Sequence, residues 1–344
     1  MDVVRILAIC GVIYIHSGDM GYSLYASTDN IVLRYIYYWF AVISEVSVPL
    51  FFMVSGALLL GKEESFENIV KKRCSRIIIV LLVASLCHYL YNGRHDNTYQ
   101  ITMTGYFKGL LNNGFTGSLW FLYAYLLYLL ILPFLRMLVR QMKGKHFVYL
   151  FGLCILFKGV IQVMLQCYGL ELEIDIYEAP FFDKIFIYPI MGYYIENVVG
   201  DNYNRIHYIW GNLLLLIATS NIVAYLSMRR NFTSANFTGY DKGLFNSMLT
   251  AVIAVSIYAL IRHTVQEISI SANVKKILKV LGTNTFGVYL LERFVRENIL
   301  GIYFWTERYL TRIGAAFILT VVTFLICEVI TFLLKKMPII RELI

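Results

Sequence analysis

The sequence of 344 residues has little charge and few residues that break helices. Only 15% of the residues are Asp, Glu, Lys or Arg, whereas a soluble domain has about 25%. Hydrophobic residues make up 59%, and the mean hydropathy is +0.65, so too few polar side chains remain to cover a surface in water. The scarcity of proline, with 5 residues, and an aromatic content of 16% exclude a disordered chain. The composition therefore predicts an integral membrane protein.

The sequence also lacks the cysteine spacing of metal sites and disulfide frameworks. None of its six cysteines belongs to a C-x-x-C motif, and most lie in apolar runs. We therefore expect buried free thiols and no metal site. The formal net charge of +8 would favour nucleic acid as the partner of a soluble protein. Membrane topology explains most of the excess cations, so no nucleic-acid partner is expected.

Apolar runs long enough to cross a membrane recur along the whole chain. Most of them contain about 17 to 25 residues, the length that spans about 30 Å of hydrocarbon at about 1.5 Å per residue. They predict an all-α polytopic membrane protein, a bundle of about ten transmembrane helices. The runs lie at residues 3–18, 36–60, 74–92, 118–139, 147–167, 181–197, 206–228, 245–262, 284–304 and 311–334.

The distribution of cations predicts which side of the membrane holds the chain ends. With residue 1 inside the cell, 18 of the 30 Lys and Arg residues fall in the inner segments. An acidic loop at residues 171–178 then falls on the outer side. Because Lys and Arg are enriched in cytoplasmic loops, both the N and C termini are expected to be cytoplasmic.

The chain is expected to be one unit. It contains no internal repeat, linker or low-complexity segment, so residues 1–344 are predicted to form a single membrane domain without a fused soluble domain. The short first run at residues 3–18 resembles a signal peptide, but Asp2 and the absence of a small-residue cleavage site argue against its removal. We expect a multi-pass protein of a bacterial plasma membrane, surrounded by membrane lipid.

The first apolar run contains the densest set of ionisable residues, which are costly inside a membrane and therefore candidates for function. Asp2 and Arg5 are three residues apart and can pair on one helix face. Arg5 and His16 are separated by three helical turns plus about 20°, so they line one stripe. If the helix continues, Asp19 can receive the imidazole N–H of His16 and stabilise an imidazolium. This set predicts acid–base chemistry, with a structural histidine near the outer interface as the alternative.

A basic cluster lies at the start of the third run. It contains Lys72, Arg73 and Arg76. Two guanidinium groups three residues apart suit a diphosphate or a phosphomonoester as ligand better than they suit a single carboxylate. We therefore predict that this cluster binds a phosphorylated cytosolic donor. The alternatives are that the cations only set the topology or hold anionic lipid.

Three further residues are candidates for contact with a substrate. Glu45 and Glu292 lie in the second and ninth runs, where ionisable side chains normally face the bundle interior. Trp120 lies near the start of the fourth run, where an aromatic ring either joins the interfacial belt or stacks on a sugar face. The sequence does not identify the partner of either carboxylate.

Six segments, in order along the chain, resemble motifs of the acyltransferase type 3 family. The opening DVVRILA at residues 2–8, followed by His16, is similar to the first-helix signature, and KRCSRI at residues 72–77 is similar to the R-x-x-R motif. After residues 289–291 this chain has Glu292, where the family often has histidine. The other similar segments lie at residues 48–56, 119–122 with 132–134, 186–193 and 286–290.

The resemblance implies a role for each matching residue. His16 would be the catalytic histidine, Arg5 its functional partner on the same helix, and Arg73 and Arg76 the arginines that bind the donor. It also implies a ten-helix bundle that takes an acyl group, usually acetyl, from cytosolic acetyl-CoA. The acceptor would be a hydroxyl of a glycan or a lipid-linked sugar at the outer face.

The leading hypothesis is thus an acetyl-CoA-dependent O-acetyltransferase that modifies a cell-surface or lipid-linked glycan. His16 would act as general base or carry the acyl group transiently, and the sequence does not choose between these roles. The alternative is a transporter or flippase for a lipid-linked saccharide, which pseudo-repeats and paired broken helices would support. The sequence contains neither. A structural or sensory module would leave the coincidence of His16, Arg5 and the two arginines unexplained.

Overall fold

A computed structural model describes residues 1–95, 101–112, 114–168, 170, 183–200, 205–233, 244–245 and 247–344. Within these segments all regular secondary structure is helical. The chain forms two compact units. The main unit contains Met1–Leu59 and Met142–Leu334, and the smaller unit contains Leu60–Gln141 and Lys335–Ile344. The acidic loop expected at residues 171–178 lies outside the described residues.

The main unit contains most of the helices. Its α-helices are α1 (Asp2–Ile15), α2 (Ile31–Glu45), α3 (Ser47–Leu59), α8 (Gly144–Cys154), α9 (Gln162–Cys167), α10 (Lys184–Tyr193), α11 (Arg205–Thr233), α12 (Leu249–Glu267), α13 (Ala272–Asn298), α14 (Leu300–Glu307) and α15 (Arg312–Leu334). Its described residues also form two 3₁₀ turns and two π-helical segments. These are η1 (Gly18–Met20), η2 (Leu24–Ala26), η4 (Ile155–Ile161) and η7 (Tyr194–Val199).

The smaller unit is built on two long helices. Its elements are α4 (Phe66–Asn68), the π-helical η3 (Ile69–Cys74), α5 (Ser75–His95), α6 (Met103–Leu111), α7 (Trp120–Gln141) and α16 (Pro338–Leu343). Because α4, η3 and α5 follow one another without a break, residues 66–95 form one continuous rod.

Seven helical segments among the described residues are long and apolar enough to cross a membrane. They are Ile31–Leu59, Phe66–His95, Trp120–Gln141, Gly144–Cys167, Arg205–Arg230, Leu249–Glu267 and Arg312–Leu334. These segments match seven of the ten predicted runs and confirm the all-helical, membrane-spanning class.

The other three runs correspond to α1, to α10 with η7, and to α13 with α14. Helix α1 has 14 residues, about 21 Å of length at about 1.5 Å per residue, and α13 carries charged residues toward both ends. The count of ten spans and the cytoplasmic termini therefore stay predictions.

The outer face of α15 is apolar. Val321, Leu325 and Val329 follow one another at intervals of four residues, and each is more than half exposed. On the other face, Thr323 and Cys327 are fully buried. A continuous apolar stripe facing water is rare in a soluble monomer, whereas lipid favours it. We therefore expect this face of α15 to contact the acyl chains.

The six cysteines are free thiols, and not all of them are buried. Cys74, Cys154 and Cys327 are buried as predicted, but Cys87 and Cys167 are exposed on α5 and α9, so the prediction is wrong for these two. A free thiol behaves as a small hydrophobic group, so an apolar helix accommodates it on a lipid-facing side as well as in a core.

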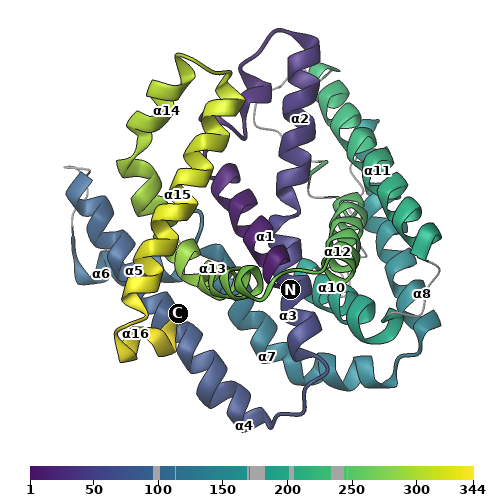
Figure 1. Ribbon diagram of the computed structural model, residues 1–344, viewed down its shortest axis with the longest axis horizontal. Coiled ribbons are helices and arrows are strands. Elements are labelled where there is room, and N and C mark those ends of the chain that lie inside the picture. The colour runs from purple at the N-terminus through teal and green to yellow at the C-terminus, as the bar shows by residue number, and fades with distance from the viewer. Residues whose placement is uncertain are drawn as a thin grey trace. The chain divides into compact units, whose positions relative to one another are not determined.

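Helix α1 packs against α13 and α15 in the main unit (Figure 1). Ile9 and Ile13 are fully buried and share a helix face with His16, at positions i, i+4 and i+7. Val288 of α13 belongs to the same apolar cluster, four residues before Glu292. Since residues three or four apart lie on one face, the cluster that holds Ile13 and Val288 also brings His16 toward Glu292.

Helices α3 and α10 cross at two glycines. A Cβ atom on Gly56 would lie 2.0 Å from the carbonyl oxygen of Pro189, and one on Gly192 would lie 2.0 Å from that of Met53. Both obstacles are backbone atoms, so a side chain at either position would force the helices apart. Gly56, which belongs to the motif at residues 48–56, therefore serves close helix packing.

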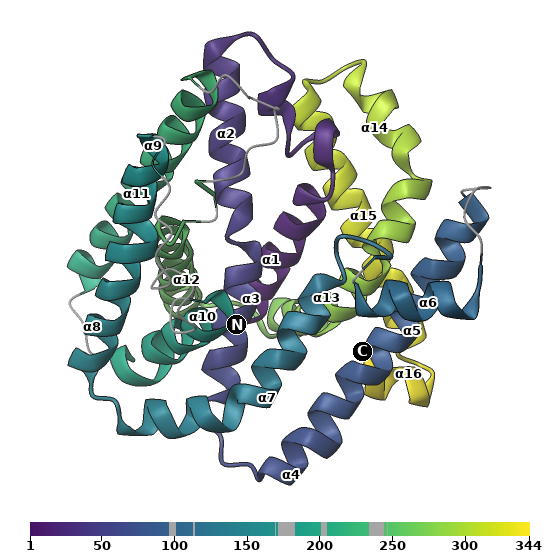
Figure 2. The ribbon, with the colours of Figure 1, turned by 180° about the vertical axis from the view of Figure 1, so that it is seen from behind.

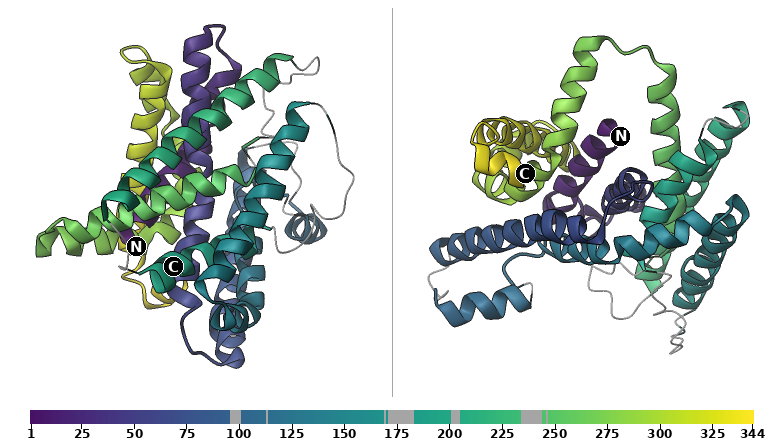
Figure 3. Two further views of the ribbon diagram at one scale, coloured as in Figure 1. Left: turned by 90° about the vertical axis from the view of Figure 1, so that its right-hand side faces the viewer. Right: turned by 90° about the horizontal axis from the view of Figure 1, so that it is seen from below.

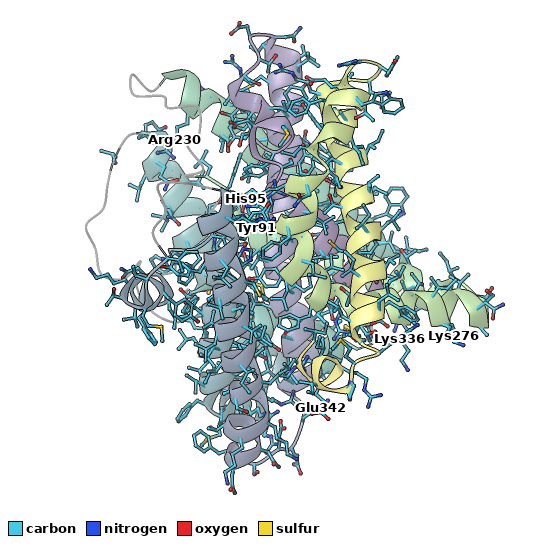
Figure 4. The ribbon with its side chains drawn as sticks, turned by 90° about the vertical axis from the view of Figure 1, so that its left-hand side faces the viewer. Tyr91, His95, Arg230, Lys276, Lys336 and Glu342 are labelled. Carbon is cyan, nitrogen blue, oxygen red and sulfur yellow. The ribbon has the colours of Figure 1, made fainter. Side chains whose placement is uncertain are left out.

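The helices after α10 complete the main unit. Helix α11 lies along α12 and α2 (Figure 2), and Trp39 of α2 donates a hydrogen bond from Nε1 to Oγ of Ser220, 3.1 Å away. The connected ends of α12 and α13 extend beyond the neighbouring helices of this unit (Figure 3). Lys276 lies in this projecting segment (Figure 4), among the exposed cations that the sequence assigned to the inner side.

Candidate functional site

His16 is held at the C-terminal end of α1. The hydroxyl of Ser17 donates to the carbonyl oxygen of Tyr14 at 2.6 Å, and Gly18 has a φ of +53°, which takes the chain out of the helix into η1. The carbonyl end of a helix carries partial negative charge and favours a cation. The local fold therefore fixes the position of the imidazole at this helix end.

The imidazole of His16 pairs with a buried carboxylate on α13. Its Nδ1 lies 2.7 Å from Oε1 of Glu292. The Glu292 side chain is 1% exposed, whereas that of His16 is 24% exposed. One turn further along α13, Nε of Arg296 donates to the other carboxylate oxygen of Glu292 at 3.4 Å. Glu292 is therefore held between an imidazole and a guanidinium group.

This pairing determines which ring nitrogen can react. An ionised carboxylate only accepts hydrogen bonds, so Nδ1 carries the proton in the contact with Glu292 and Nε2 keeps its lone pair. Nε2 can then accept a proton from a hydroxyl or attack an acyl carbon, and Glu292 stabilises the positive charge that develops on the ring. The arrangement is suited to acyl transfer to or from an oxygen nucleophile.

The carboxylate on Nδ1 comes from α13, and the helix that was expected to carry Asp19 ends earlier. The sequence predicted this contact for Asp19 on condition that the first helix continues, but α1 ends at Ile15 because of the turn at Gly18. Asp19 lies in η1. Glu292 contacts His16, and its predicted contact with a substrate stays a prediction. A catalytic role for Asp19 stays a prediction.

The predicted pairing of Asp2 and Arg5 is confirmed. Nη1 of Arg5 donates to Oδ1 of Asp2 at 3.3 Å. A Cβ atom on Gly282 of α13 would lie 2.4 Å from Cβ of Asp2, so α1 and α13 also touch closely near the start of α1. The two helices thus contact each other near both ends of α1. The part of Arg5 in catalysis stays a prediction.

Glu45 and Trp120 belong to other helices than this pair. Glu45 ends α2 and accepts a hydrogen bond from the hydroxyl of Tyr22, a buried residue just after η1. Trp120 begins α7 in the smaller unit, where it is partly exposed and packs edge-to-face with Phe121. Their contact with a substrate stays a prediction.

The smaller unit gathers cations around Glu64. Nε of Arg73 donates to both carboxylate oxygens of Glu64, at 2.9 and 3.1 Å. Arg136 of α7 donates from Nη2 to Oε2 at 3.3 Å and from Nη1 to the main-chain oxygen of the same residue at 3.3 Å. Desolvation alone would raise the pKa of Glu64, but the hydrogen bonds and charges of Arg73 and Arg136 outweigh it and lower the pKa. Glu64 is therefore an anion at neutral pH.

Arg73 and Arg76, the predicted pair of parallel guanidinium groups, have different acceptors. Arg73 lies in the π-helical η3, whereas Arg76 lies in α5 and donates from Nε to the main-chain oxygen of Leu343 at 3.0 Å. Lys72 is exposed in η3. In an α-helix residues 73 and 76 lie on one face, whereas the wider π-helical turn changes the angle between them.

A pocket of about 540 Å³ opens beside this cluster, within the size range of small-molecule sites. Lys62, Ser65, Arg136 and Arg140 line it, together with Glu63, Glu64 and apolar atoms of α7. The sequence assigned Arg136 to topology, yet its side chain is only 6% exposed.

A pattern in the sequence marks Arg136 as buried. It lies on the apolar stripe of α7 formed by Leu129, Leu132 and Val139, all of which are buried. An arginine at a core-facing position of an otherwise apolar helix indicates an ionic partner, which here is Glu64.

These features define a polytopic membrane protein with a histidine–carboxylate pair suited to group transfer. The family model of the acyltransferase domain, acyltransferase type 3, matches residues 1–332, and the chain belongs to this family. The protein is therefore a membrane acyltransferase, which favours the enzyme over the transporter alternative. No curated protein and no solved structure matches the chain.

Proposed function

We propose that the protein is an O-acetyltransferase that moves an acetyl group from cytosolic acetyl-CoA to a hydroxyl of a cell-surface or lipid-linked glycan. The observation that carries the proposal is the 2.7 Å contact between Nδ1 of His16 and the buried carboxylate of Glu292, in a chain of the acyltransferase family. It leaves Nε2 as the reactive nitrogen and provides a counter-charge for an imidazolium.

In one mechanism His16 acts as general base. Nε2 takes the proton of the sugar hydroxyl while the oxygen attacks the carbonyl carbon of the thioester, forming the new C–O bond. The C–S bond then breaks, and the imidazolium returns the proton to the departing thiolate. Glu292 stabilises the imidazolium between these steps, and such acid–base assistance contributes roughly 10² to 10⁴ in rate.

In the other mechanism His16 carries the acyl group. Nε2 attacks the thioester carbon, the thiolate leaves, and an acyl-imidazole forms whose ring charge Glu292 offsets. The sugar hydroxyl then attacks the same carbon and releases the imidazole, with its proton passing to solvent. This splits one transfer into two steps. Acetylated His16, trapped with acetyl-CoA in the absence of acceptor and located by peptide mass spectrometry, distinguishes this mechanism from the first.

The smaller unit is assigned to the donor. Arg73, Arg76 and Lys72 provide positive charge for the phosphate groups of CoA, and the pocket beside Arg136 has a suitable volume. For the acceptor, Glu45 of the main unit is a candidate for contact with sugar hydroxyls. Trp120 remains a candidate for stacking on a sugar ring.

The test uses purified protein in proteoliposomes with radiolabelled acetyl-CoA. We expect release of free CoA and transfer of label to a lipid-linked oligosaccharide fraction or, without acceptor, slow hydrolysis to acetate. Free CoA is measured by mass spectrometry, which distinguishes its thiol from the free thiols of the protein. Protein that neither binds nor consumes acetyl-CoA would contradict the proposed donor while leaving the family assignment intact.

A further inference from the structure

The Glu64 carboxylate lies where a phosphate group would be bound. It accepts from Nε of Arg73 on η3 and from Nη2 of Arg136 on α7, so two guanidinium groups from different helices converge on one anion. Arginines in this arrangement are the usual protein ligands of phosphate, and a carboxylate is the weaker of the two anions for them.

The contacts of Glu64 are weak enough to be exchanged. Arg73 uses only its Nε, and the Arg136 contact is long, at 3.3 Å. The carboxylate is 17% exposed and Arg73 is 32% exposed, so solvent screens the ion pair. Partly exposed pairs of this kind contribute little to stability, whereas a phosphate offers more charge and more acceptor oxygens to the same groups.

Arg136 stays in place if the carboxylate leaves. Its Nη1 donates to the main-chain oxygen of Glu64, and its stem is buried on the apolar stripe of α7. The side chain of Glu64 can therefore move away while the backbone still holds the guanidinium group. The adjoining pocket, lined also by Lys62 and Arg140, provides room for the rest of a ligand and further positive charge.

We propose that Arg73 and Arg136 form a phosphate site, and that Glu64 occupies it as an internal anion until a phosphate group of the donor displaces it. The ligand class is a phosphomonoester or diphosphate of a nucleotide-type donor. The inference rests on the proposed function, which supplies such a donor. It assigns Arg136 to donor binding and gives Glu64 the role of a competitor that lowers the apparent affinity.

The direction in which one substitution changes the affinity for CoA tests this inference. Glu64→Gln keeps the side-chain volume but removes the competing charge, so CoA measured by calorimetry in detergent should bind about 3 to 10 times more tightly, since occupancy by the carboxylate reduces the competent fraction. The matched control is Glu67→Gln, a 69% exposed neighbour that pairs with Lys71 and does not line the pocket, which should change the Kd less than about twofold. Arg136→Gln should weaken binding at least about tenfold. Unchanged or weaker binding by Glu64→Gln would overturn the inference.

A second measurement uses the wild-type protein and so does not depend on the folding of a variant. Carbodiimide labelling of carboxylates, read by mass spectrometry, should increase at Glu64 when CoA saturates the protein. Glu67, which pairs with Lys71 on the exposed side of the same segment, serves as the internal reference and should not change. Labelling of Glu64 that stays constant or falls at saturating CoA would overturn the inference.

Pyrophosphate as a second probe separates this inference from the proposed donor. Binding of pyrophosphate with increased labelling of Glu64, but without binding of CoA, would support the phosphate site and contradict the donor. Binding of CoA that ignores both Glu64 and Arg136 would support the donor and contradict the phosphate site.

Discussion

Removal of the charge on Glu292 should slow acetyl transfer by a predictable amount. Glu292→Gln preserves the shape of a side chain that is 1% exposed and changes only its charge and hydrogen bonding. Two unit charges about 4 Å apart interact by about 4 kcal/mol at an effective dielectric constant of about 20. His16 is partly exposed and Arg296 already compensates part of the carboxylate charge. We therefore expect a loss of about 2 to 3 kcal/mol in the transition state, or roughly 30- to 150-fold in rate.

The assay is the rate of label transfer from saturating acetyl-CoA in proteoliposomes, measured for His16→Gln, Glu292→Gln and the double variant. If Glu292 acts through His16, the double variant should be no slower than His16→Gln alone, because the charge has no imidazolium left to stabilise. Glu297→Gln is the matched control. It removes a carboxylate that lies on the same helix but pairs with Arg293. A Glu292→Gln enzyme with the wild-type rate would refute the reasoning.

Three further predictions concern the fold and the donor site. Gly192→Ala should lower stability by about 1 to 3 kcal/mol, seen as a lower Tm, whereas Gly211→Ala, with open space at its Cβ position, should not. Because the pKa of Glu64 is lowered in the fold, its ion pairs stabilise the protein above its usual pKa of 4.5, and this is lost as the pH falls below that value, so the Tm advantage over Glu64→Gln should vanish in acid. Changing both Arg73 and Arg76 to Lys keeps the charge but should weaken CoA binding at least about tenfold by calorimetry.

Each of these predictions has a clear contrary result. An unchanged Tm for Gly192→Ala would mean that the crossing of α3 and α10 is looser than the 2.0 Å approach indicates. A Tm difference for Glu64→Gln that persists after the pH has fallen well below the lowered pKa of Glu64 would mean that the effect does not come from the carboxylate charge. Full CoA affinity in the double Lys variant would mean that the two arginines serve topology alone.

The part of the site that depends on local spacing could be predicted from the sequence. Asp2 and Arg5 are one helical turn apart, and the structure pairs them. The partner of His16 could not be predicted in this way, because Glu292 is 276 residues away in the chain and only the packing of α1 on α13 brings the two together. The spacing of His16 and Asp19 predicts their contact only on a continuous helix, and α1 ends before Asp19, at the turn near Gly18.

The donor cluster could likewise be predicted only in part from the sequence. The basic segment at residues 72–76 was evident from composition, but its angular arrangement depends on a π-helical turn that residue spacing does not reveal. The position of Arg136 near the end of a span indicates a role in setting the membrane topology. Its position on the buried stripe of α7 was visible in the sequence, yet the reason for its burial, Glu64, lies 72 residues earlier.

The most direct test of the account is acetyl transfer by His16→Gln compared with the wild-type protein. Glutamine can still donate a hydrogen bond to the buried Glu292, so it avoids the loss of stability, about 3 to 5 kcal/mol, that removing one partner of a buried ion pair can cause. Wild-type protein should move labelled acetyl from acetyl-CoA to the glycan acceptor, and the variant should fold with a similar Tm but lose at least about 10² in rate. A near wild-type rate for His16→Gln would contradict His16 as base or acyl carrier. Glu45 and Glu292 would then be the candidates for the catalytic group.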